Sequence, residues 1–172
     1  MRILAISMMA IGVCVPAVRA QQAGGSIDVP AGASVVLQAK GDGVQIYTCA
    51  DLAGGAKWAL TLPDAKLLDA AGKTIGSHFA GPTWKLEDGG QVQGALVASK
   101  PSPEAGSVAW LLLRAKPGTA AGSLADVAFV RRTETHGGVA PASGCAGSPD
   151  AGKTLRVPYT ATYTFYADSA KR

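Results

Sequence analysis

Hydrophobic and polar residues alternate along most of this chain, in short runs separated by turn-forming residues. The run over residues 155–166 is the most regular, because tyrosine, alanine and phenylalanine at odd positions alternate with threonine. A period of two is typical of a β-strand, in which successive side chains point to opposite faces. We therefore predict a strand here, and Pro158 near its start indicates a strand edge or a bulge.

Similar runs predict further strands. They cover residues 35–39, 44–49, 58–62, 91–99, 107–115 and 124–133. Residues 40–43 and 87–90, both rich in glycine and acidic residues, are predicted hairpin turns. Residues 110–113 are apolar on both faces, which predicts a strand buried from both sides. Residues 65–72 leave room for one short helical turn.

About nine strands at roughly ten-residue spacing predict an all-β fold, a single-domain antiparallel β-sandwich or barrel-like structure with little helix. Composition agrees, since 22 glycines and 10 prolines among 172 residues, with only 16% charged residues, favour a turn-rich β protein over a helical bundle. The length fits one domain, which we expect over residues 27–168.

The N-terminus carries an uncharged apolar run over residues 3–15. This run of about 13 residues is shorter than the ~20 needed to span a bilayer as a helix, and Val18 and Ala20 are small residues of the kind that signal peptidase reads. We expect a signal peptide over residues 1–20, cleaved after Ala20, then a flexible leader over residues 21–26. The predicted product is periplasmic or secreted and has no membrane span.

Cleavage would leave two of the three cysteines, Cys49 and Cys145. An even pair in an oxidising compartment predicts one disulfide. The alternative is a redox or metal-thiolate pair; the wide separation of the two cysteines in sequence opposes a C-x-x-C redox pair.

The basic charge of the chain belongs partly to the predicted signal peptide. Removing Arg2 and Arg19 reduces the formal net charge from +4 to +2. No remaining Lys/Arg cluster is larger than Arg131–Arg132, whereas a nucleic-acid surface needs a basic stripe that binds several phosphates. We expect no nucleic-acid partner.

Two glycine-rich segments resemble nucleotide-binding motifs. Residues 147–154 satisfy the pattern G-x-x-x-x-G-K-[ST], but a predicted strand follows where a phosphate-binding loop needs a helix, and Pro149 removes one amide. Residues 41–43 begin a dinucleotide fingerprint, yet Ile46 stands where its third glycine would be. The common serine and zinc hydrolase signatures are absent. We therefore expect no cofactor and no resident metal.

The chain contains two histidines, His78 and His136. With Asp88 or Glu87 they would form a metal or acid–base site if the fold brought them together. The other interpretation is a hydrogen-bonded His78 at a strand end and a solvated His136 in a loop. Both interpretations stay open.

Residues 76–84 are the most specific stretch, with His78 and Trp84 around a Gly-Pro turn. Trp84 would serve as a stacking platform for a sugar or another flat ligand, with His78 as its polar partner. The alternative is a core tryptophan that closes one end of the fold.

Several motifs follow one another over nearly the whole chain after the predicted leader. They are QIYTC (45–49), GSHFAGPTW (76–84), WLLL (110–113), RT (132–133), GGVAP (137–141), Cys145, VPY (157–159) and YTFY (163–166). This order resembles the exported bacterial and fungal family called domain of unknown function 3455. The resemblance implies that His78, Gly81, Pro82, Trp84, the 137–138 glycine pair and both cysteines stand at family motif positions. It implies no established activity.

These observations favour a non-catalytic exported β domain, a binding or envelope-associated module with a cell-wall or glycan ligand. We expect residues 76–84 and the 133–145 loop to form one surface. The alternative is a secreted enzyme or metal-binding protein using His78 with Asp88 or His136. A structural protein related to stress or desiccation is a third hypothesis.

Overall fold

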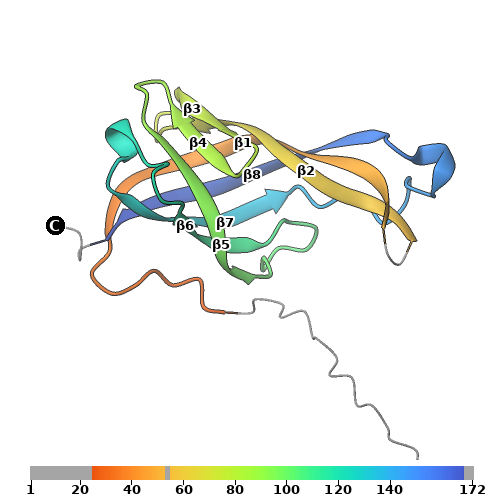
Figure 1. Ribbon diagram of the computed structural model, residues 1–172, viewed down its shortest axis with the longest axis horizontal. Helices are drawn as coiled ribbons and strands as arrows, with labels where there is room; N and C mark the ends of the chain where they lie inside the picture. Colours follow the sequence, from red (N-terminus) through yellow and green to blue (C-terminus); the bar gives the residue numbers. More distant parts are fainter. Residues whose placement is uncertain (1–24, 53–54, 169–172) are drawn as a thin grey trace, which may run out of the picture.

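The computed structural model describes residues 25–52 and 55–168. Its strands, joined in chain order, form one antiparallel sheet that closes on itself where β8 pairs with β1 (Figure 1). The elements are β1 (Ser34–Leu52), β2 (Gly55–Leu68), β3 (Thr74–Phe79), β4 (Thr83–Leu86), β5 (Gln91–Lys100), β6 (Trp110–Ala115), β7 (Val127–Gly137) and β8 (Thr154–Ala167), with the short 3₁₀ helices η1 (Gly122–Leu124) and η2 (Ser148–Asp150). The all-β antiparallel class is confirmed, and the described residues form an eight-stranded closed barrel.

The predicted hairpin turn at residues 40–43 is wrong, because β1 runs through it without interruption. A Cβ on Gly41 would lie 2.5 Å from Cε2 of Tyr163, and one on Gly43 would lie 2.2 Å from the carbonyl oxygen of Asp64. Both glycines therefore allow close packing inside the barrel instead of turning the chain. Two predicted strands thus merge into β1, whereas β3 and β4 lie outside the predicted strand ranges, and the total is eight strands where about nine were predicted.

The helical turn predicted within residues 65–72 is also wrong, since β2 continues to Leu68. The turn to β3 follows it, and the Asp69 carboxylate accepts hydrogen bonds from the backbone amides of Ala71 and Lys73. Pro158 lies at an edge as predicted. On one side it pairs with Val44 of β1. On the other side it has no partner in β7, because the β7–β8 ladder ends at the neighbouring pair, Gly137 and Tyr159.

Inward-pointing side chains from all eight strands fill the barrel interior. Inward and outward side chains alternate along each strand of a small closed barrel. One half of the interior is apolar. It holds Ala39, Leu67, Leu86, Val92, Leu113, Leu124, Val127, Val130 and Phe165. This half is a packed core with no need for hydrogen-bond partners.

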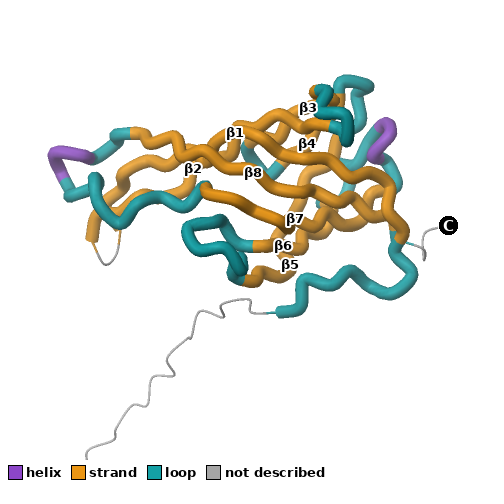
Figure 2. The backbone as a smooth tube through the Cα atoms, turned by 180° about the vertical axis from the view of Figure 1, so that it is seen from behind, coloured by secondary structure: helices purple, strands orange, loops and turns teal. Residues whose placement is uncertain are grey.

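A second, smaller core lies outside the barrel wall. Residues 25–33 run along the outside before β1 begins (Figure 2). Ile27 of this segment packs with Leu112, Phe129 and Tyr166, which point outward from β6, β7 and β8. Leu112 is thus buried outside and Leu113 inside, which confirms that residues 110–113 are buried on both faces.

The β3–β4, β5–β6 and β7–β8 connections all lie at one end of the barrel, because neighbouring strands run antiparallel in chain order. We call this the loop end; it comprises residues 80–82, 101–109 and 138–153. The predicted disulfide is confirmed here, where Cys49 of β1 joins Cys145 of the longest loop with a Cα–Cα distance of 5.4 Å. Within residues 25–52 and 55–168, no helix is long and apolar enough to cross a membrane.

The predicted signal peptide over residues 1–20 and its cleavage after Ala20 lie outside the described residues, as does the leader up to residue 24. The disulfide is compatible with an exported protein, since such bonds persist in oxidising compartments.

Candidate functional site

His78 and Trp84 lie directly opposite each other on the β3–β4 hairpin, and both point into the barrel. They are 3% and 1% exposed. Their rings stack with centroids 4.6 Å apart and planes 11° from parallel, and the indole makes edge-to-face contacts with Tyr163 and Phe165. One indole face is therefore covered by the imidazole, and the geometry is that of a core tryptophan.

His78 is held by one hydrogen bond. Its Nδ1 lies 2.9 Å from the carbonyl oxygen of Thr83, and since a carbonyl only accepts, Nδ1 carries the proton. Burial lowers the pKa of His78 from 6.5 to about 4; the Thr83 carbonyl opposes this and the positive charge of Arg132 adds to it. His78 is therefore neutral at neutral pH.

The half of the interior nearer the loop end is polar, and two tyrosines lie at its centre. The hydroxyls of Tyr159 and Tyr163 are 3.1 Å apart. The Tyr163 ring lies 5.0 Å from the His78 ring. Burial raises the pKa of both hydroxyls, although Arg132 acts in the opposite direction on each. Both tyrosines therefore stay protonated and remain able to donate.

Arg132 is the charged member of this group. It lies directly opposite Tyr163 in the β7–β8 ladder, so it shares the inner face, and its positive charge acts on the Tyr163 hydroxyl. Its Nε and Nη2 donate to the carbonyl oxygen of Ala109, at 3.0 and 2.8 Å. In residues 25–52 and 55–168, no carboxylate lies within 4.0 Å of its guanidinium. Its charge is therefore not balanced by an ion pair.

The 137–138 glycine pair covers this polar half. A Cβ on Gly138, which has a φ of 89°, would lie 2.9 Å from Tyr159 Cβ and 3.3 Å from Gln45 Cγ. The carbonyl of Gly138 accepts a hydrogen bond of 2.6 Å from the Tyr47 hydroxyl. Gln45 is 1% exposed, and its Nε2 has no hydrogen-bond partner in the described structure. The loop thus closes against the interior at a position that needs glycine.

Asp88 lies away from this group, in the β4–β5 turn at the opposite end of the barrel. Its carboxylate accepts a 2.8 Å hydrogen bond from the amide of Gly90. That bond, with one from Ser123, lowers the pKa of Asp88. These contacts are what a turn-forming aspartate makes.

His136 lies on the outside of β7, where its Nδ1 is 2.5 Å from a carboxylate oxygen of Glu104 in the β5–β6 loop. Its side chain is 63% exposed. The structure thus brings His78 and Trp84 together and gives Asp88 and His136 other partners. Across the described residues, no group of three or more His, Cys, Asp or Glu side chains is arranged to hold a metal ion.

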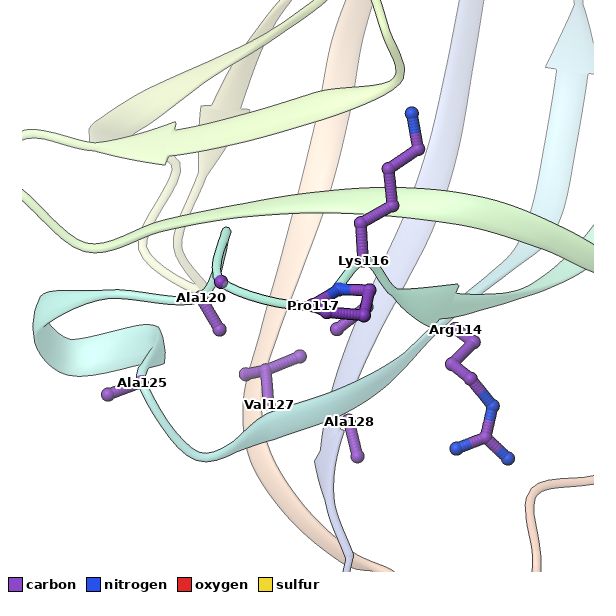
Figure 3. Close-up of a pocket in the computed structure, with 9 residues that line it drawn as sticks. Arg114, Lys116, Pro117, Ala120, Ala125, Val127 and Ala128 are labelled. Carbon is purple, nitrogen blue, oxygen red and sulfur yellow. The ribbon is translucent and has the colours of Figure 1, made fainter.

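A surface hollow of about 320 Å³ lies at the β6–β7 connection (Figure 3). Arg114 and Lys116 are its charged lining residues, and the others are alanine, glycine, proline and valine. Figure 3 shows the two basic side chains pointing in opposite directions, and Arg114 lies over the Phe129 ring at 4.5 Å. The hollow therefore lacks converging polar groups, unlike the loop end.

Arg132, Tyr159, Tyr163 and Gln45 are not among the candidate site residues predicted from the sequence. The usable signal was alternation: Gln45 shares a strand face with Tyr47, and Tyr159 shares one with Tyr163. In the sequence, Arg132 stands out as half of a basic pair and as part of RT (132–133), and neither pattern assigns it to a site.

Comparison with known proteins gives one match. The family model described as "Protein of unknown function (DUF3455)" matches residues 30–167, which include every strand of the barrel. No curated protein and no solved structure matches the chain significantly. The resemblance inferred from the motifs is confirmed: this chain belongs to the DUF3455 family.

Proposed function

We propose that this protein is a non-catalytic, exported binding module whose ligand contacts the loop end of the barrel. The observation that carries the proposal is the distribution of polar groups inside the barrel. Arg132, Tyr159, Tyr163 and Gln45 gather at the loop end, with His78 beside Tyr163, while the rest of the interior is largely apolar. Buried polar groups reduce stability unless they are satisfied, so their confinement to one end favours a role in recognition.

The rigidity of this end supports the same role. The disulfide fixes the longest loop to β1, and Trp58 of β2 donates a 2.9 Å hydrogen bond from its indole to the Ser143 carbonyl. The β5–β6 loop is fixed to β7 by the hydrogen bond of 2.6 Å from Thr135 Oγ1 to the Val108 carbonyl. Loops held in this way lose little conformational entropy on binding.

The metal or acid–base alternative has no such support. His78 is neutral, buried and hydrogen-bonded to a carbonyl, and neither Asp88 nor His136 contacts it. The residues available for that chemistry therefore do not form a constellation of nucleophile, acid and base.

A cell-wall pull-down tests the proposal. The protein purified from its own periplasm is expected to be retained on insoluble cell wall or polysaccharide. Val139 at the loop end and Leu96 on β5 are both exposed aliphatic residues, at 47% and 58%. V139E is expected to reduce retention, whereas L96E, the matched control on the outer wall, is not. Equal loss in both variants, or no retention of the wild type on any of these materials, would contradict the proposal.

A further inference from the structure

We propose that the loop end binds an oxyanion, a carboxylate or phosphate group of the ligand, against the guanidinium of Arg132. This inference rests on the binding role proposed above and names the chemical group that the site recognises. It is carried by three observations on the described residues: the unbalanced charge of Arg132, its free donors, and the neutral donor-rich surroundings.

The charge of Arg132 points into the barrel from β7, opposite Tyr163. Partly buried charges in proteins are usually paired with an opposite charge, because desolvation is otherwise costly. Asp64, the acidic residue that acts electrostatically on Tyr159, is exposed and forms its ion pair with Arg156. Arg132 thus keeps a positive charge that no carboxylate of the described residues neutralises within 4.0 Å.

The guanidinium also has donors to spare. Of the five N–H donors of an arginine, the Ala109 carbonyl accepts from Nε and from one N–H of Nη2. Three N–H groups remain for an incoming acceptor. The existing bonds fix the plane of the guanidinium, which is the preorganisation that oxyanion recognition needs.

The groups around Arg132 are neutral and able to donate. Tyr47, Tyr159 and Tyr163 have raised pKa values because of burial, so their hydroxyls keep their protons. The buried Nε2 of Gln45, at the same end, is a donor without a partner in the described structure. The unmet hydrogen-bonding capacity here is therefore of the donor type, and an oxyanion supplies only acceptors.

Arg132 is also within reach of solvent. It is half-buried, whereas Tyr163 and Gln45 are 1% exposed. An anionic group can therefore meet the guanidinium from the loop end without unfolding the barrel, while the rest of the ligand stays on the outer surface of the loops.

The test uses inorganic phosphate and acetate as separate probes, followed by ¹⁵N-HSQC spectra of the full chain. We expect saturable shifts of the Arg132 Nε–H signal with at least one probe, and the stronger probe distinguishes a phosphate from a carboxylate ligand. R132Q is expected to weaken binding at least tenfold, R132K less, and Y159F by a smaller factor, because charge-assisted hydrogen bonds are the stronger ones. The amide signals report binding in the variants.

Arg131 provides the matched control. It is the next residue on the same strand, but its guanidinium lies over the Tyr166 ring at 5.3 Å, in the outer cluster. R131Q removes the same charge and is expected to bind like the wild type. Equal affinity in R132Q, equal loss in R131Q, or no saturable shift with either probe would overturn the inference. Cell-wall retention without anion binding would refute only this inference, whereas anion binding without retention would refute only the proposed function.

Discussion

Acidification is expected to destabilise this barrel through a single buried side chain, His78. Burial lowers the pKa of His78 in the folded state from 6.5 to about 4. The unfolded chain keeps the ordinary value, so between these two pH values the unfolded state binds one proton more than the folded state. The stability contribution is therefore present above pH 6.5 and is lost as the pH falls towards 4.

The size of the effect follows from the same two values. One pH unit of unequal proton binding corresponds to about 1.4 kcal/mol. We expect the free energy of unfolding to fall by about 2 kcal/mol between pH 7 and pH 5, and by about 3 kcal/mol at pH 4. Asp88 and Asp150 add to the loss only near pH 4, because their pKa values are lowered from 3.8 in the folded state and the unfolded chain binds their protons first as the pH approaches 3.8.

Urea unfolding followed by tryptophan fluorescence at pH 7, 6 and 5 measures this loss. The chain has two histidines, which makes the comparison clean. H78Q is expected to be less stable at pH 7 and to show a much smaller loss towards pH 5. H136Q, altered at a side chain that is 63% exposed, should keep the wild-type loss. An unchanged pH dependence in H78Q, or its disappearance in H136Q, would refute the reasoning.

Three further substitutions test the packing, each by the midpoint and slope of urea unfolding. Trp84→Ala removes a side chain that is 1% exposed and should lower the free energy of unfolding by about 3–5 kcal/mol. Trp58→Ala, at a half-buried position, should lower it less, and equal losses would contradict the assignment of Trp84 to the core. Cys49→Ser removes a cross-link between residues 96 apart and should lower the free energy of unfolding by up to about 4–5 kcal/mol. A reducing agent should cause the same loss in the wild type and no further loss in the variant. Gly138→Ala should cost more than Gly72→Ala, since both glycines have positive φ but only Gly138 is crowded; a larger loss for Gly72→Ala would count against this packing.

The strands were predictable from alternation, but the role of glycine inside a strand was not. Residues 40–43 have the composition of a hairpin turn, and in sequence nothing separates that case from a strand with two glycines. The distinction comes from Tyr163, which packs against Gly41 from the far end of the chain. A local pattern cannot contain this information, because the space that Gly41 provides is used by a residue more than a hundred positions away.

The polar half of the interior was missed for a related reason. Alternation tells which residues share a face, but not which face lies inside, whenever both faces are apolar. On β6 and β7 the outer face is apolar too, because residues 25–33 cover it, so Leu112 and Phe129 are as buried as Leu113 and Val130. Arg131 and Arg132 therefore could not be assigned to the outside and the inside from their own strand.

The closed sheet resolves this ambiguity, and it does so through β8. Tyr159 and Tyr163 lie on the most regular strand of the chain, whose threonines mark the outward face over residues 160–162. Once the β7–β8 register places Arg132 opposite Tyr163, the arginine must share the inner face with both tyrosines. Barrel closure then brings Gln45 of β1 to the same end, because β1 is the other neighbour of β8. The candidate site is thus a consequence of register between distant strands, which explains why its members carry no contiguous motif.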